Sequence, residues 1–261
     1  MKKYLGIWWR LAVNSLLAQL SYRLGSVGFL LGKMVRLLFF FAYIVAIFTH
    51  TKTLAGYSLV ETVLFFLTFN LVDITAQIFF RGIYGARRAV VEGDLDYYMV
   101  QPCDPLFRMA CTTVDFLDVV TMAPVLLMVA EAIRRLPGET SLLSVVLYAL
   151  LTLNGVAIAF AIHVVVAALA VRTQELDNTI WLYRDMMFLG KFPADIYNRP
   201  LQRVLIYLIP IAVMTTFPAK ALLGRLDLGW ILYAFALAAV CVSGSLWLWR
   251  DALRRYTSVS S

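Results

Sequence analysis

Several apolar runs in this chain are long enough to cross a lipid bilayer, and they constrain its fold more than any other feature. A helix that spans a bilayer needs roughly 20 apolar residues in succession. A sixth run is more polar than the other five because it contains Arg184 and Asp185. The six runs cover residues 27–48, 59–80, 112–133, 142–171, 176–192 and 228–249. We therefore expect one all-α membrane domain over residues 1–261, with six transmembrane helices.

Composition supports this interpretation. Hydrophobic residues make up 62% of the chain and charged residues only 15%, whereas about 25% of the residues of a soluble protein are charged. The net charge is +7, which in a soluble protein would suggest nucleic acid as a partner. In a membrane protein the same charge is typical of cytoplasmic helix ends that face anionic headgroups. We therefore expect membrane lipid, and no nucleic acid, as a partner.

The basic residues are distributed unevenly between the two sides. With six spans and a cytoplasmic N-terminus, the short outer loops contain only Lys52, Arg134 and Arg135, while the inner segments contain many more Lys and Arg. Cytoplasmic loops are enriched in these residues, so we expect a multi-pass protein of the cytoplasmic (inner) membrane with both termini in the cytoplasm. Lys33 and Arg36, in the first third of the first span, are expected to snorkel toward the near headgroups.

Residues 4–25 precede the first span and have the pattern of an amphipathic helix. At 100° per residue, Arg10 and Asn14 share one narrow stripe, whereas Trp8 and Trp9 lie elsewhere on the helix. This pattern favours a helix that lies in the membrane interface with its tryptophans at headgroup depth. The alternative is a short soluble helix packed on the bundle.

Residues 193–224 contain an apolar run that is too short to span. Val204–Phe217 contains Pro210 and is followed directly by Pro218. A run of this length favours a re-entrant hairpin, which we place on the outer side between the fifth and sixth spans, with its entry at Phe192–Pro193. A seventh span is the alternative, but it would put the basic C-terminal segment outside and weaken the charge asymmetry.

Polar residues inside the spans are candidates for function because lipid does not solvate them. Asn70, Asp73 and Gln77 are spaced i, i+3, i+7 and share one helix face. That face either lines a pathway or a dimer contact, or forms a hydrogen-bond network between helices. Arg184 and Asp185 point to different faces, so each needs its own partner, such as Glu175, Asp177 or an acidic residue on another span. Asp115 and Asp118 lie at the start of the third span, and we expect them to cap that helix.

The connection 81–110 is the longest polar segment. Arg87 and Arg88 fall in a helix that continues from the second span, and Gly93 breaks it. Asp94 is expected to cap a second short helix that ends before Pro102. That helix would present Leu95, Tyr98 and Met99 on one side and Asp94, Asp96 and Tyr97 around the rest, and Glu92 lies just before it. It is either a docking element for a partner or a solvated loop.

The chain lacks the motifs of common active sites. It contains no G-x-x-x-x-G-K-[ST] loop for nucleotide phosphates and no Cys/His cluster with metal spacing. We therefore expect no catalytic residue, no metal and no cofactor in this chain.

Two stretches resemble the ABC type-2 exporter permeases. One is the cytoplasmic pattern G-x-L-D-x-x-L/M-x-x-P, which is matched by Gly93, Leu95, Asp96, Met99 and Pro102. The other is the F-P, I-Y, I-P and P-A signature, which is matched within Lys191–Gly224. Six spans and an N-terminal interfacial helix agree with this resemblance over nearly the whole chain.

The resemblance implies a function and partners. Such permeases form homodimers or heterodimers, and a separate ATPase subunit that binds ATP and Mg²⁺ docks on the loop between the second and third spans. The second and fifth spans would line the path of the exported substrate, which adds Trp181 and Arg184 to the pathway residues. Drugs, lipid-linked sugars, peptides and other natural products all remain possible substrates. A membrane scaffold is the main alternative, and a secondary transporter is a weaker one because no inverted repeat is visible.

Overall fold

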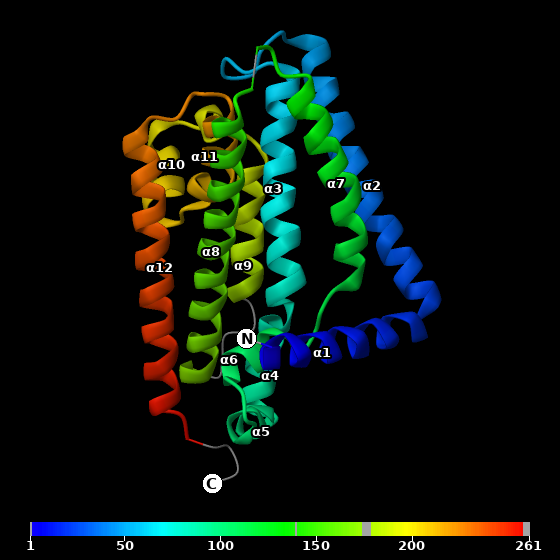
Figure 1. Cartoon of the computed structure of the whole chain (residues 1–261), viewed down its shortest axis with the longest axis vertical. Coiled ribbons are helices and arrows are strands. Elements are labelled where there is room, and N and C mark those ends of the chain that lie inside the picture. The colour runs from blue at the N-terminus through cyan, green and yellow to red at the C-terminus, as the bar shows by residue number, and fades with distance from the viewer. Residues whose placement is uncertain (1, 139, 174–178, 258–261) are drawn as a thin grey trace.

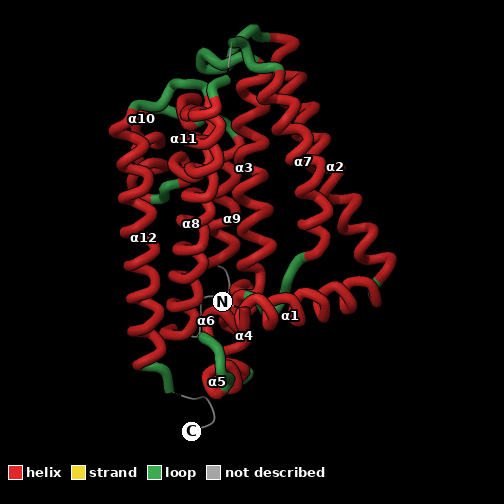
Figure 2. Tube along the Cα trace, viewed as in Figure 1, coloured by secondary structure: helices red, strands yellow, loops and turns green. Residues whose placement is uncertain are grey.

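The computed structural model describes residues 2–138, 140–173 and 179–257. Within these ranges the chain is helical and forms no named strand (Figures 1 and 2), which confirms the all-α prediction. The helices are α1 Lys2–Ser21, α2 Arg23–His50, α3 Leu59–Phe80, α4 Ala86–Val91, α5 Asp94–Val100, α6 Pro105–Ala110, α7 Phe116–Arg134, α8 Leu142–Thr173, α9 Thr179–Met187, α10 Arg199–Arg203, α11 Ile211–Leu222 and α12 Leu228–Arg254. Short 3₁₀ turns cover Arg81–Gly85, Phe188–Lys191 and Ala194–Ile196.

Helix α3 lies at the centre of the bundle (Figure 1). It packs against α7, α8 and α11, while α8 also packs along α12. Leu64, Leu67 and Val72 on α3 are completely buried. By contrast, α2 and α12 expose many large apolar side chains, such as Phe39 and Trp247. Exposed apolar surface on this scale is expected where a helix faces lipid or a partner subunit.

Five helical stretches in the described chain are long and apolar enough to cross a membrane: 24–50, 59–91, 116–134, 142–173 and 228–254. A sixth span results only if the bent pair 199–208 and 211–222 counts as one. The two parts of this pair meet at an angle of 99°, at Ile209 and Pro210. Proline lacks the amide proton that a continuous helix needs, which accounts for the break.

Of the predicted span 176–192, the structure describes residues 179–192, and these do not form one long helix. Helix α9 has only nine residues and passes into the 3₁₀ turn Phe188–Lys191. The helix stops because Pro193 forces Phe192 into an extended conformation, with φ −115° and ψ 156°. A Cβ atom on Gly190 would lie 2.9 Å from Ile211 Cγ2, so the turn is also packed closely on α11. A helix as long as the predicted one therefore does not form here.

Helix α1 runs across the lower end of the bundle, almost at right angles to the long helices (Figure 1). It is tied to the segment that leads into α7: Lys3 Nζ donates to Pro102 O at 2.5 Å, and Ser15 Oγ accepts from the Val114 amide at 3.2 Å. The helix predicted over residues 4–25 is therefore present, and it turns into α2 at Tyr22.

Candidate functional site

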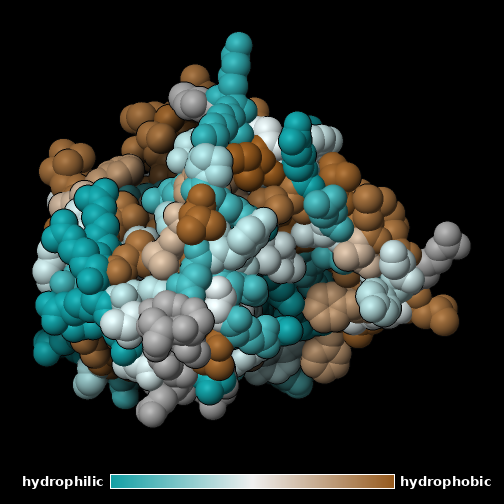
Figure 3. Space-filling view, turned by 90° about the horizontal axis from the view of Figure 1, so that it is seen from below, coloured by the Kyte–Doolittle hydropathy of each residue, from teal (hydrophilic) through white to brown (hydrophobic). Residues whose placement is uncertain are grey.

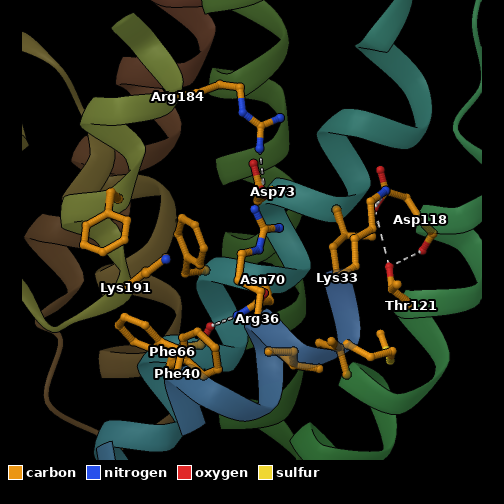
Figure 4. A pocket seen from close by; sticks show the side chains of 16 residues that line it. Lys33, Arg36, Phe40, Phe66, Asn70, Asp73, Asp118, Thr121, Arg184 and Lys191 are labelled. Atoms are coloured by element: carbon orange, nitrogen blue, oxygen red, sulfur yellow. Dashed lines mark hydrogen bonds and ion pairs between the residues drawn. The ribbon is translucent and has the colours of Figure 1, made fainter. Parts of the chain in front are cut away.

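A polar cavity of about 90 Å³ lies between α2, α3, α7 and the segment α9–Lys191. It is unusual for a bundle with such apolar helices because charged side chains enter it from several sides (Figure 4). Four phenylalanines, including Phe40 and Phe66, form much of the remaining wall. The charged residues that line it are Lys33, Arg36, Asp73, Asp118, Arg184 and Lys191.

The polar face predicted on α3 is a connected network. Asn70 and Asp73 line the cavity, and Asn70 also donates to Phe66 O at 2.7 Å. Gln77 lies one turn below Asp73, donates to Asp73 Oδ2 at 2.9 Å and accepts from Arg81 NH1 at 2.7 Å. The face therefore lines a cavity, and its hydrogen bonds stay within α3 and the turn that follows, whereas the predicted network joined different helices.

The partners of Arg184 on α9 lie on α3 and on the 3₁₀ turn that follows it. Its NH1 group donates to Tyr84 Oη at 3.0 Å, and its NH2 group lies 4.0 Å from Asp73 Oδ2. The partners considered from the sequence, Glu175 and Asp177, lie outside the described residues. Trp181 does not line this cavity. It is 54% exposed and packs edge-on against Tyr84 at 5.9 Å.

The expectation that Lys33 snorkels to the headgroups is wrong. Its Nζ atom lies 2.6 Å from Asp118 Oδ1 and 3.0 Å from Asp115 Oδ2, and its side chain is only 11% exposed. An ammonium group at this depth gains more from two carboxylates than from extending past the apolar surface. Asp115 also caps α7, as predicted, by accepting from the Leu117 amide at 3.1 Å, and Arg81 lies 3.7 Å from it.

Lys191 is a cavity residue that the sequence analysis did not single out. Its Nζ atom lies 3.8 Å from the centre of the Phe188 ring and 4.5 Å from that of Phe40. The sequence could have identified Lys191, because a lysine inside a predicted span is a candidate functional residue. Phe192 instead packs outside the cavity against Phe40 and Tyr43, with ring centres 5.5 and 6.5 Å apart.

The three prolines of the predicted hairpin region, Pro193, Pro210 and Pro218, lie in different parts of the structure. Pro193 follows the 3₁₀ turn of Lys191, Pro210 sits at the 99° bend, and Pro218 lies buried inside α11. None of the three lines the charged cavity.

A second site lies at the lower end of the molecule, where α3 continues through Arg81–Gly85 into α4 and then α5. Gly93, with φ +82°, separates α4 from α5 as predicted. Gly93 itself is the N-cap, so Asp94 is the first helical residue and not the cap. Gln101 is extended, with ψ 149°, and ends α5 before Pro102.

The exposed side of α5 differs from the predicted one. Leu95 is completely buried and Tyr98 is 7% exposed, so both hold the helix against its neighbours and do not form its outer surface. Arg108 lies over the Tyr98 ring at 5.0 Å. Tyr97 and Val100 are 60% and 79% exposed. Of the side predicted to face outward, only Met99 is exposed, at 39%.

We call the exposed residues of this end the docking face. Arg88 and Glu92 on it form an ion pair at 2.9 Å, while Arg87 and Asp96 are half-buried beside it. Seen from below, this end is mainly hydrophilic with isolated apolar residues (Figure 3). The docking face consists of Arg88, Glu92, Asp94, Tyr97, Met99 and Val100.

Among the described residues, no group of three or more His, Cys, Asp or Glu side chains could hold a metal ion. The structure therefore contains a charged cavity on α3 and an exposed short helix, α5, that follows the end of the same helical stretch.

Comparison with protein families gives one match. The family model described as "ABC-2 family transporter protein" matches residues 33–260. Neither the search of curated proteins nor the search of solved structures found a match. The match covers the cavity, the docking face and every helix from α3 to α12, together with most of α2. This chain is a multi-pass membrane protein that belongs to the ABC-2 transporter family.

Proposed function

We propose that this chain is the permease subunit of an exporter, and that it moves a substrate out of the cytoplasm or the inner leaflet. Permeases of the ABC-2 family work with an ATP-binding subunit. We infer that this subunit carries ATP and Mg²⁺ and docks on the 81–110 connection. ATP hydrolysis would then take place on the partner, and this chain would supply the path.

One observation carries the proposal: the helical stretch that lines the cavity ends directly before α5 and the docking face. Asp73 lines the cavity, and the chain from Asp73 to Val91 is helical throughout, through α3, the 3₁₀ turn and α4. Leu95 and Tyr98 then anchor α5 to the bundle. Helix α5 packs against α4, so a displacement of α5 by a partner would pass to α4 and then along this helical stretch to the cavity wall, which is how packed helices couple distant sites.

The membrane orientation follows from the distribution of charge and from the ends of the chain. The start of α1, the end of α12 and α5 all lie at the lower end of the molecule (Figure 1). The basic loops predict that this end is cytoplasmic, in the inner membrane. In this orientation α1 lies in the inner interface, and the bent pair around Pro210 enters from the outer side as a re-entrant hairpin.

We also propose that two permease subunits pair, as identical copies or as paralogues. The exposed apolar side chains of α9 and the 3₁₀ turn after it support this, because Leu182 is 62% exposed and Phe188, at the edge of the cavity, is 54% exposed. A cavity that contains several charges is more stable against a second subunit than against lipid.

Co-purification tests the proposal directly. The tagged full chain would be expressed with the ATPase encoded by a neighbouring gene, purified in mild detergent and examined for a bound Walker-A ATPase. We expect a stable complex whose ATPase activity exceeds that of the isolated ATPase. If the ATPase neither binds nor changes its activity, the export proposal fails.

A further inference from the structure

We propose that the charged cavity binds a phosphate or diphosphate group, carried either by the exported molecule or by a lipid headgroup. The inference rests on the proposed function only for its role in transport, since binding itself needs no ATPase. The observation is a charge imbalance. Four basic and two acidic side chains line the cavity, which leaves a formal excess of two positive charges in a part of the chain surrounded by membrane-spanning helices.

Two of the four basic residues already have partners. Lys33 is held by Asp118 and Asp115 at 2.6 and 3.0 Å. Arg184 bonds Tyr84 and lies 4.0 Å from Asp73. The two acidic residues that line the cavity are therefore engaged with these two cations.

The other two, Arg36 and Lys191, have no carboxylate within 4.0 Å and no hydrogen-bond acceptor among residues 2–138, 140–173 and 179–257. Arg36 is exposed at the mouth of the cavity. Lys191 rests on the rings of Phe188 and Phe40. Aromatic faces attract a cation but accept few of its hydrogen bonds, so the three ammonium donors of Lys191 remain available.

Arg36 and Lys191 line the same cavity, so both of their positive charges face one space. Two like charges that converge on one cavity with unused donors are stabilised by a shared anion. A guanidinium and an ammonium group together suit phosphate oxygens, since the guanidinium binds two of them side by side and the ammonium acts as a point charge. The excess of two charges matches a dianion.

The shape of the cavity agrees with this ligand. A water molecule needs roughly 10–15 Å³ of such space, so a cavity of about 90 Å³ can hold a phosphoryl group of a few heavy atoms. Phe40, Phe66 and Phe188 form an apolar wall beside the cations. A phosphate attached to an apolar or aromatic body would therefore fit better than a free, strongly hydrated ion.

The test measures binding to the purified full chain in neutral detergent by titration calorimetry at constant ionic strength. The probes are pyrophosphate and dioctanoyl phosphatidic acid, with dioctanoyl phosphatidylcholine as the uncharged reference. We expect pyrophosphate, phosphatidic acid or both to bind, and phosphatidylcholine not to bind. Binding of pyrophosphate supports a phosphorylated substrate as the source, and binding of phosphatidic acid alone supports a lipid headgroup.

The variant Arg36→Gln/Lys191→Gln should weaken this binding by about tenfold or more, because it removes two charge-assisted contacts. The matched control Lys52→Gln/Arg134→Gln removes the same charge from exposed positions that do not line the cavity. It should bind the anion as the parent does. Without an anion, the cavity variant should unfold at the same temperature as the parent or a higher one, since a repulsion is removed. The variant Arg36→Lys/Lys191→Arg keeps both charges and should still bind.

The proposal is overturned if neither anion binds the parent, or if binding survives in Arg36→Gln/Lys191→Gln. These results are independent of the ATPase co-purification, so the cavity proposal can fail while the export proposal stands, and the reverse also holds.

Discussion

The ammonium group of Lys33 on α2 lies 2.6 Å from the carboxylate of Asp118 on α7, and the two side chains are 11% and 3% exposed. This contact joins two helices that otherwise diverge over part of their length. It also gives the first prediction. Lys33→Met leaves Asp118 and Asp115 without their main cation, and breaking a buried ion pair in this way costs about 3–5 kcal/mol. The measurement is thermal unfolding of the purified chain in detergent.

Two controls separate this effect from a general loss of charge. In Lys33→Met/Asp118→Asn the uncompensated carboxylate is gone and Asp115 retains Arg81 at 3.7 Å, so most of the stability should return. Arg135→Met breaks an exposed pair with Glu131 and should change the unfolding temperature little, because exposed pairs contribute little. If Lys33→Met unfolds like the parent, the buried pair does not form in the membrane protein.

Gly155 on α8 makes possible a close approach to α11. A Cβ atom at this position would lie 2.5 Å from Met214 O, and a backbone atom cannot rotate away. Gly155→Ala should therefore destabilise the chain by about 1–3 kcal/mol. On α12, Gly229 has no atom within 4 Å of a Cβ, so Gly229→Ala should leave the stability unchanged or raise it slightly, because alanine favours helix. Equal unfolding temperatures for the two variants would contradict the close packing.

The features that the sequence predicted correctly are local ones. The break at Gly93 and the stop before Pro102 depend on backbone preferences that each residue has by itself. Long apolar runs such as 142–171 also identify their helix without knowledge of neighbours. The stop at Phe192 is local as well, because Pro193 restricts the residue before it in any fold.

The features that the sequence did not predict depend on which helices meet. Lys33 and Asp118 are 85 residues apart, and no pattern along the chain relates them. The same holds for the cavity, where Arg36 comes from α2 and Lys191 comes from the turn after α9. For α5, the pattern grouped Leu95, Tyr98 and Met99 on one side correctly, but whether that side meets a partner or the bundle depends on the neighbouring helices, and Leu95 and Tyr98 are buried.

Thiol chemistry tests the membrane orientation of the lower end. Cys111 is 5% exposed, and burial raises its pKa to about 11, so only about one in a thousand of these thiols is ionised at pH 8. Cys103 is half-buried in the loop before α6. In a Cys241→Ser background, a membrane-impermeant maleimide should label one fast site, which Cys103→Ser removes and Cys111→Ser does not.

The side of the membrane from which Cys103 is labelled tests the proposed orientation. If the lower end is cytoplasmic, inside-out vesicles should react quickly and intact cells slowly. Fast labelling of intact cells would reverse the proposed orientation. Raising the pH from 7 toward 10 should speed the labelling of Cys111, because its thiolate fraction grows steadily below a pKa of about 11.

Tyr97 and Tyr98 are adjacent on α5 and should behave in opposite ways. Tyr97 is 60% exposed on the docking face, whereas Tyr98 is 7% exposed and lies under Arg108. Tyr97→Ala should keep the unfolding temperature and lower both the binding and the stimulation of the ATPase, since exposed aromatics anchor protein interfaces. Tyr98→Ala should destabilise the chain by about 3 kcal/mol through lost packing.

The pair also distinguishes contact from anchoring. Tyr98→Phe keeps the ring that Arg108 covers, so it should restore stability and ATPase binding together. Arg88→Glu reverses an exposed charge on the docking face, and it should weaken ATPase binding with no change in the unfolding temperature. If Tyr97→Ala and Arg88→Glu both bind and stimulate the ATPase as the parent does, the partner docks elsewhere, and α5 serves only to close the end of the bundle.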